Sequence, residues 1–178
     1  MAEEFERRPA PATPYVWNGQ VLSVSVSAVE ATLRMLHRFG PREACAFWYG
    51  DRASDGGQVQ AVLAPRQHME RTWYDVRPQA MSEMAEVLRD TDWRPLAQIH
   101  SHPGPWVEHS LYDDRMVSTK RALSLVIPNY GRWRGPWPIG MAVHEYAGGY
   151  WHMLTDTVAA RRVRLEPACA LRIQDLRP

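Results

Sequence analysis

The sequence predicts a single mixed α/β domain of the α+β type, for three reasons. The chain has 178 residues, of which 45% are hydrophobic and 23% are charged, and these values are ordinary for one globular domain. A chain of this length buries roughly 70% of the surface that it exposes when unfolded, so its core requires neither a disulfide nor a structural metal. Strand-like and helix-like segments follow one another along the chain without an internal repeat or a low-complexity tract.

We expect the domain to span residues 15–178. Residues 1–14 precede it and contain Pro9, Pro11 and Pro14 but few apolar side chains with which to anchor themselves. Such a segment cannot bury enough apolar surface to hold a fixed structure, so we expect a flexible N-terminal lead-in.

The domain is expected to begin with a strand and a helix. Residues 21–26 alternate apolar side chains with serine, as a half-buried strand does. Ser27 and Glu30 have the spacing of a capping box, which predicts that a helix starts there. Gly40 and the proline after it predict where that helix stops.

A hairpin is expected next. Residues 43–49 form a continuous apolar run headed by Glu43, and residues 59–63 form a second apolar run. The segment between them, residues 51–57, is rich in turn-forming residues. Two apolar runs joined in this way predict two antiparallel strands.

The second half of the chain continues the mixed pattern. Pro78 stands at a first-turn position and opens a helix that is expected to end around residues 90–92. The remaining elements are expected to be a strand over residues 95–100, a helix over 110–120, a strand over 122–127, and a hairpin of 139–146 with 150–154 around Gly148 and Gly149. Residues after Thr155 fit a strand or a helix equally well.

Charge and hydropathy exclude several classes of function. The chain holds 21 Lys and Arg against 20 Asp and Glu, which leaves no general positive field for nucleic acid. No apolar run approaches the ~18 residues that a membrane span needs, and the first residues are acidic where a signal peptide is basic and then apolar. Two cysteines in a chain of this length indicate free thiols in a reducing compartment. We therefore expect a cytoplasmic protein whose partners are neither nucleic acid nor membrane.

The segment from Gln98 to Asp114 carries the chemistry. His100 and His102 stand at positions i and i+2 at the end of a predicted strand, so their imidazoles point to the same face. Neutral imidazole is the commonest metal ligand among side chains. Asp113 lies in the first turn of the next predicted helix, where its carboxylate can reach the same ion. Three protein ligands leave a fourth position for water, which is typical of a catalytic zinc.

A carboxylate and a hydroxyl complete the predicted site. Glu43 heads an otherwise apolar strand, where a charge is unfavourable unless it works beside a cation, so we expect it to move the proton. Ser110 stands three residues before Asp113 and can donate to the oxyanion of a tetrahedral intermediate or act only as a helix cap. Asp114 is the alternative ligand, but the spacing selects Asp113 and leaves Asp114 as a first-turn charge that the helix dipole favours. Cys45 shares the face of Glu43, but a cysteine is most often a small buried hydrophobe.

The spacing of these residues resembles a known motif. The pattern His-x-His-x7-Ser-x2-Asp, which runs from His100 to Asp113 with Glu43 upstream, resembles the JAMM (MPN+) motif of the JAB-domain metalloproteases. The residues after Glu43 resemble the family's Glu-x-x-Gly-x-aliphatic-x-Gly, with Ala46 in place of the first glycine and Trp48 in place of the aliphatic residue. These two departures concern packing and leave the ligands intact.

The resemblance covers residues 22–154 and implies both an architecture and a reaction. The family has a curved mixed β-sheet flanked by helices, in a cytidine-deaminase-like arrangement. The resemblance implies one Zn²⁺ per chain held by His100, His102 and Asp113, with Glu43 and Ser110 assisting the hydrolysis of an amide or isopeptide bond.

A narrower similarity concerns the substrate. The short chain and the loop before Ser110 are most similar to bacterial JAB proteins that accompany ubiquitin-activating and ubiquitin-conjugating homologues. This implies removal of a ubiquitin-like modifier from conjugates or fusions by attack of a zinc-bound water, with the modifier, its conjugates and those enzymes as partners. Two alternatives stay open: a peptidase that processes a sulfur-carrier protein or a small amino-acid adduct, and a non-catalytic scaffold of the same fold.

Two further features allow more than one interpretation. The aromatic loop with Tyr130, Trp133 and Trp137 contains residue types that dominate many interfaces, so it is expected either to clamp the modifier or to pack as core. The other histidines have no such neighbours and are expected to be surface or hydrogen-bonded core residues. Among them His109 stands out because it adjoins Ser110.

Overall fold

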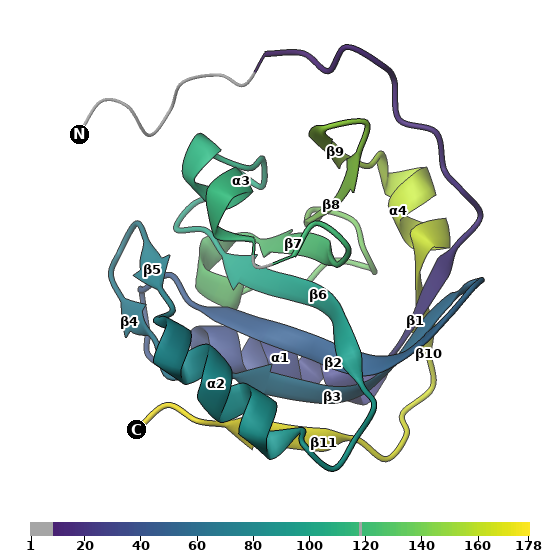
Figure 1. Cartoon of the computed structure of the whole chain (residues 1–178). Coiled ribbons are helices and arrows are strands. Elements are labelled where there is room, and N and C mark those ends of the chain that lie inside the picture. Colours follow the sequence, from purple (N-terminus) through teal and green to yellow (C-terminus); the bar gives the residue numbers. More distant parts are fainter. Residues whose placement is uncertain (1–8, 118) are drawn as a thin grey trace.

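A computed structural model describes residues 9–117 and 119–178 of the chain. In these residues the backbone forms a strongly curled mixed sheet with helices packed on its two faces (Figure 1). The elements in chain order are β1 (Val21–Ser25), α1 (Val26–His37), β2 (Cys45–Ala53), β3 (Gly56–Ala64), β4 (His68–Met69), β5 (Tyr74–Asp75), α2 (Pro78–Val87), β6 (Arg94–Ser101), α3 (Leu111–Met116), β7 (Leu123–Ile127), the 3-10 helix η2 (Asn129–Gly131), β8 (Ala142–Ala147), β9 (Tyr150–Met153), α4 (Asp156–Arg162), β10 (Val163–Glu166) and β11 (Arg172–Asp175).

The main sheet has the strand order β10-β1-β3-β2-β6-β7-β8-β9, and β11 pairs with β3 beside this path. The pairs β1–β3, β1–β10, β3–β11 and β6–β7 are parallel, and the other pairs are antiparallel. The strands β4 and β5 form a separate two-stranded sheet. The curled mixed sheet with flanking helices confirms the predicted α+β class.

The two faces of the sheet carry two hydrophobic clusters. Because side chains alternate along a strand, Ala46 and Trp48 of β2 join the cluster under α1, whereas Cys45 and Phe47 join the cluster under α2. The indole nitrogen of Trp48 also donates a hydrogen bond of 2.7 Å to the hydroxyl of Thr32 in α1. The helices α1 and α2 therefore cover opposite faces of β2 and β3.

The helix α4 joins the two ends of the curl. It packs against β8, the next-to-last strand at one end of the sheet order, and against β1 and β10 at the other end. Arg162 of α4 forms two hydrogen bonds of 2.9 Å with the carboxylate of Glu145 in β8. The hydroxyl of Tyr15 donates to the same carboxylate at 2.6 Å. The N-terminal part of the domain is thus fastened to the strands that follow the predicted site.

The helix α1 begins earlier than the capping-box spacing predicts. Ser25 is its N-cap, and the Ser25 hydroxyl accepts a hydrogen bond of 3.2 Å from the backbone N–H of Ala28. The prediction that Ser27 and Glu30 cap this helix is wrong. Ser25 is still paired with β10 in the sheet, and the chain turns from strand to helix with no residue between them, so the last serine of the strand takes the cap.

Other boundaries also differ from the predictions. The strand β2 begins at Cys45, so Glu43 lies two residues before it, and β2 extends to Ala53 because its pairing with β3 continues to Gly56. The helix α3 ends at Met116, four residues before the predicted end. The segment after Thr155, which fitted either a strand or a helix, contains both.

The aromatic loop packs against the core. Trp133 and Trp137 contact the cluster under α1, and their rings lie 6.1 Å apart, edge to face. Trp137 donates a hydrogen bond of 2.8 Å from its indole nitrogen to the backbone carbonyl of Val163. Of the two interpretations of this loop, the structure favours packing for these two tryptophans.

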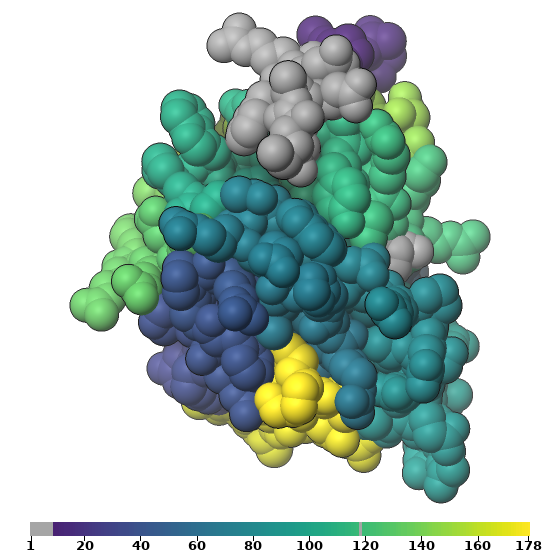
Figure 2. All heavy atoms as spheres, turned by 90° about the vertical axis from the view of Figure 1, so that its left-hand side faces the viewer, coloured from purple at the N-terminus to yellow at the C-terminus, as the bar shows by residue number. Residues whose placement is uncertain are grey.

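The C-terminal residues are seated beside α2 and the loop after α1 (Figure 2). Asp175 accepts hydrogen bonds from Arg38 at 2.8 Å and from Arg177 at 2.7 and 2.8 Å. Arg177 in turn donates to the backbone carbonyl of Met35 in α1 at 2.8 Å. These hydrogen bonds attach the C-terminal residues to α1 and to the residue that follows it.

Two predictions remain: a flexible N-terminal lead-in and the absence of a membrane span. Residues 1–8 lie outside the described residues and residues 9–14 contain no helix or strand, so a flexible lead-in over 1–14 stays a prediction. The longest helix, α1, has 12 residues, and among the described residues no helix combines the length and the apolar character that a bilayer span requires.

Candidate metal centre

Two of the predicted ligands lie at the end of β6, where this strand runs between β2 and β7. His100 is the next-to-last residue of β6 and pairs with Cys45 of β2 and Val126 of β7. His102 follows the strand directly, and its backbone N–H donates to the carbonyl of Ile127 at 2.9 Å. Because residues two positions apart on extended backbone face the same way, the two imidazoles project from the same side.

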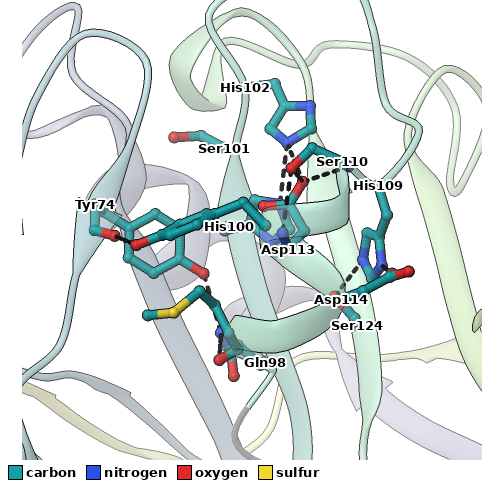
Figure 3. Close-up of polar contacts among 12 residues, drawn as sticks. Tyr74, Gln98, His100, Ser101, His102, His109, Ser110, Asp113, Asp114 and Ser124 are labelled. Atoms are coloured by element: carbon teal, nitrogen blue, oxygen red, sulfur yellow. Dashed lines mark hydrogen bonds and ion pairs between the residues drawn. The ribbon is translucent and has the colours of Figure 1, made fainter. Parts of the chain in front are cut away.

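The third predicted ligand completes a compact group of donors. The Nε2 atoms of His100 and His102 are 3.1 Å apart. Asp113 of α3 places Oδ1 at 3.3 Å from Nε2 of His100 and Oδ2 at 3.4 Å from Nε2 of His102. Figure 3 shows the three side chains turned toward one another. His100 and Asp113 are buried and His102 is partly exposed, so the group lies at the protein surface but is closed from behind.

Burial and mutual attraction set the protonation of this group. Burial lowers the pKa of His100 below its ordinary value, and the Asp113 carboxylate only partly offsets this. Burial also acts on His102, but its hydrogen bond and ion pair with Asp113 prevail and raise its pKa. Burial alone would raise the pKa of Asp113, yet the two imidazoles hold it well below its usual range. Asp113 is therefore a carboxylate, which is the form that binds a cation.

The donor set fits a zinc ion. In His102, Nδ1 lies 3.0 Å from the backbone carbonyl oxygen of Trp106, which can only accept a hydrogen bond. In the neutral ring Nδ1 therefore carries the proton, and Nε2 is the nitrogen that can bind a metal in place of its contact with Asp113. Two imidazole nitrogens and one carboxylate oxygen are ligands that catalytic zinc sites use. These ligand atoms all lie within 4.8 Å of one another, so a single ion can bind all three.

Ser110 acts as the N-cap of α3. Its hydroxyl accepts from the backbone N–H of Asp113 at 3.1 Å, and the carboxylate of Asp113 accepts from the backbone N–H of Ser110 at 2.7 Å. The Ser110 hydroxyl also lies 2.7 Å from Oδ2 of Asp113 and donates to it. This capping box fixes the orientation of the Asp113 carboxylate. The structure thus confirms the helix-cap role of Ser110 and leaves its part in hydrolysis a prediction.

Glu43 lies beside the same strand end. Its backbone N–H donates to the carbonyl of Glu70 at 2.7 Å, and the next residue, Ala44, exchanges two hydrogen bonds with Ser101 at 3.0 and 3.2 Å. Continuing this antiparallel register by one residue places Glu43 opposite His102. Glu43 is 7% exposed, and its negative charge contributes to the raised pKa of His102. Glu43 therefore lies at the same strand end as the histidines, and its role in moving the proton stays a prediction.

The structure separates the two neighbouring carboxylates of α3. Asp113 faces the histidines, whereas Oδ1 of Asp114 lies 2.9 Å from Nδ1 of His109 (Figure 3). Sequence reasoning also missed Tyr74 of β5, whose ring centroid lies 5.8 Å from that of His100. Burial raises the pKa of Tyr74 well above its ordinary value. No local pattern points to Tyr74, because it reaches His100 only through the packing of the separate β4–β5 sheet on the cluster under α2.

Comparison with known proteins assigns the fold and the motif to a family. The model of the Prok-JAB family, the prokaryotic homologs of the JAB domain, matches residues 25–137, a range that contains all five predicted site residues. The chain belongs to the Prok-JAB family. This confirms the resemblance to the JAMM/JAB metalloproteases that the spacing of His100, His102, Ser110 and Asp113 indicated.

Two relatives agree with this assignment. The chain is 31% identical over 148 residues to a protein of Sinorhizobium fredii (strain NBRC 101917 / NGR234) described as "Probable metalloprotease y4jG", and the match covers 79% of this chain and 89% of that protein. The fold of this chain is also similar to the solution structure of protein DSY2949 from Desulfitobacterium hafniense, with a TM-score of 0.64 and 17% identity. The match covers 83% of this chain and 94% of that one. The first match supports the family, and the second supports the fold.

Proposed function

We propose that this Prok-JAB protein is a zinc-dependent peptidase that removes a ubiquitin-like modifier from conjugates or fusions. The observation that carries the proposal is the convergence of His100, His102 and Asp113 on one point at the molecular surface, with Glu43 at the adjoining strand end. A purely structural set of three such residues would have no need to present three metal-binding atoms toward the same partly exposed point. The relative described as a probable metalloprotease supports the reaction class.

The roles of the residues follow from their positions. Zinc bound by the two histidines and Asp113 would lower the pKa of a coordinated water and polarise the scissile carbonyl. Glu43 would take up the proton of the attacking water and pass it to the leaving amine, which requires a carboxylate close to the ligands but not among them. Ser110 would donate a hydrogen bond from its hydroxyl to the oxyanion, in place of the one that it donates to Asp113.

The surroundings of the site suit an extended peptide. The β4–β5 sheet has only two strands, so each has an outer edge that pairs with no other strand of the described residues. This small sheet is joined to Glu43 through the carbonyl of Glu70. A depression of about 480 Å³ is lined by residues of this small sheet and the turn after it together with Tyr112 of α3, which precedes Asp113 in the sequence. A modifier tail could add to the free strand edge through main-chain hydrogen bonds.

The proposal includes a compartment and partners. Cys45 and Cys169 are both free thiols, which suits a reducing cytoplasm. A deconjugating peptidase in that compartment would act on the products of activating and conjugating enzymes, so we propose those enzymes as functional partners.

The decisive experiment offers purified protein a panel of substrates, with and without a chelator. The panel contains a ubiquitin-like protein fused to a reporter, an isopeptide conjugate of the same modifier, and a sulfur-carrier protein with a C-terminal extension. The proposal expects cleavage of the first two after the modifier tail, loss of cleavage with the chelator, and recovery with Zn²⁺. Cleavage of the sulfur carrier alone would show that the proposed substrate is wrong and that the protein processes a sulfur carrier. No cleavage of any substrate by zinc-loaded protein would favour the scaffold alternative.

A further inference from the structure

A second constellation of polar residues lies directly behind the ligands, and the proposed reaction does not use it. His109 places Nδ1 at 2.9 Å from Oδ1 of Asp114 in α3 and Nε2 at 2.8 Å from the hydroxyl of Ser124 in β7. Figure 3 shows this chain of contacts running from α3 to the sheet. A carboxylate only accepts, so Nδ1 carries the proton, and Nε2 of the neutral ring accepts from the Ser124 hydroxyl.

The order Asp, His, Ser matches that of a hydrolase triad, but the burial of the serine excludes that chemistry. Ser124 is 0% exposed and lies in β7, which is paired on both sides with β6 and β8. A nucleophile must reach its substrate, and no substrate reaches a residue in the middle of a covered strand. The contacts therefore connect parts of the protein to each other.

A second histidine strengthens this connection. The ring of His144 in β8 stacks on the ring of His109, with centroids 3.8 Å apart and planes 16° apart. Nε2 of His144 lies 3.0 Å from the backbone carbonyl of Val107, which belongs to the same loop as His109. Both histidine side chains are buried. The loop between the ligands is thus attached to β7 through Ser124 and to β8 through Val107.

The loop needs this attachment because α3 is short. α3 has six residues, too few for a helix to be stable by itself, so its position depends on tertiary contacts. His109 immediately precedes Ser110, which caps α3 and orients the carboxylate of Asp113. Asp114, the other member of the constellation, immediately follows that ligand. The residues on both sides of the capping box are therefore fixed to the sheet.

We propose that His109, held between Asp114 and Ser124 and stacked on His144, is a positioning residue that places Ser110 and Asp113 for zinc binding. Loss of a hydrogen bond made directly to a metal ligand lowers metal affinity by ~10–100-fold. His109 bonds to Asp114 and Ser124 and so acts one step further from the metal, which is why we expect the lower end of that range. This inference takes only the identity of the metal, zinc, from the proposed function.

The test compares three variants by zinc affinity, measured by competition with a chelator, and by the melting temperature of the metal-free protein. His109→Phe keeps an aromatic ring on His144 but removes both hydrogen bonds. Ser124→Ala removes one of them and adds no volume. His152→Phe is the matched control, because His152 is also a buried histidine of the sheet with one backbone hydrogen bond, to the carbonyl of Ala147 at 3.1 Å.

We expect His109→Phe to weaken zinc binding by ~10-fold or more, Ser124→Ala to weaken it less, and His152→Phe to leave it unchanged. Unchanged zinc affinity in both His109→Phe and Ser124→Ala would overturn the proposal, as would an equal loss in His152→Phe, which would indicate general destabilisation. If His109→Phe does not fold, Ser124→Ala decides. These constants are measured without substrate, so wild-type protein that binds zinc and cleaves nothing would refute the proposed reaction and leave this inference standing.

Discussion

Ser110 performs two tasks in the structure, and the substitution Ser110→Ala can separate them from its proposed part in catalysis. In Ser110→Ala the hydroxyl no longer accepts from the backbone N–H of Asp113 at 3.1 Å and no longer donates to the Asp113 carboxylate at 2.7 Å. The backbone N–H of residue 110 still reaches that carboxylate, at 2.7 Å in the wild-type protein. The ligand therefore keeps a hydrogen bond and both histidine partners.

The size of the effect on stability follows from these contacts. Loss of an N-cap hydroxyl costs about 1 kcal/mol. Loss of a hydrogen bond to a charged group costs about 1.5–3 kcal/mol, and the lower end applies because the Asp113 carboxylate stays partnered. We therefore expect Ser110→Ala to lower the free energy of unfolding by about 2–3 kcal/mol, which corresponds to a melting temperature roughly 4–12 °C lower in a domain of this size.

The effect on turnover must be much larger if Ser110 also stabilises the oxyanion. Removal of one oxyanion donor lowers kcat by ~10²–10³-fold. The assay measures kcat on a cleaved modifier fusion, with metal content and melting temperature measured on the same preparation. Ser25→Ala is the matched control, because Ser25 caps α1 with the same hydroxyl geometry, at 3.2 Å from the N–H of Ala28, far from the ligands along the sheet. It should be destabilised by about 1 kcal/mol and keep wild-type kcat.

One result would refute the reasoning about Ser110. If zinc-loaded Ser110→Ala is less stable but cleaves at the wild-type rate, the hydroxyl is a helix cap and nothing more. A fall in kcat that is matched by Ser25→Ala would point to lost stability as the cause.

Four further predictions concern other parts of the domain. His102→Ala should lose the metal, as measured by elemental analysis, while the metal-free protein keeps its fold, because a core of this size does not depend on a metal; a full zinc content would contradict the ligand assignment. Glu43→Gln should keep zinc and lower kcat by ~10²-fold or more, and an unchanged rate would make Glu43 a structural carboxylate. Trp133→Ala should lower the melting temperature and leave KM unchanged, because the Trp133 ring packs on the core and its indole nitrogen donates to the carbonyl of Ile139 at 2.6 Å. A raised KM in a protein of normal stability would instead indicate that the aromatic loop binds the modifier. Burial alone would raise the pKa of Asp175, but hydrogen bonds from Arg177 and Arg38 prevail and lower it. The ionised Asp175 therefore contributes its full stabilisation at pH values above the ordinary aspartate pKa, and this contribution is lost as the pH falls through the lowered pKa of the folded protein. The difference in melting temperature between wild type and Asp175→Asn should therefore shrink below pH about 4, and a constant difference would disprove the assignment.

The amino-acid sequence by itself determined the parts of the site that depend on short separations along the chain. His100 and His102 face the same way because extended backbone has a period of two. Ser110 and Asp113 form a capping box because residues three apart meet in the first turn of a helix. The strand and helix patterns likewise predicted most elements, although local spacing selected Ser27 as the cap of α1 where pairing of β1 with β10 assigns Ser25.

Only the tertiary structure decided which segments meet across the sheet. Tyr74 lies beside His100 because the separate β4–β5 sheet packs on the cluster under α2. Ser124 holds His109 because β7 lies between β6 and β8, next to the strand that carries the ligand histidines. The spacing in the sequence already selected Asp113 as the ligand, but only the tertiary structure shows that Asp114 pairs with His109. The physical reason is that burial and pairing of distant segments are long-range and cooperative, whereas periodicity and capping act within one turn or one strand.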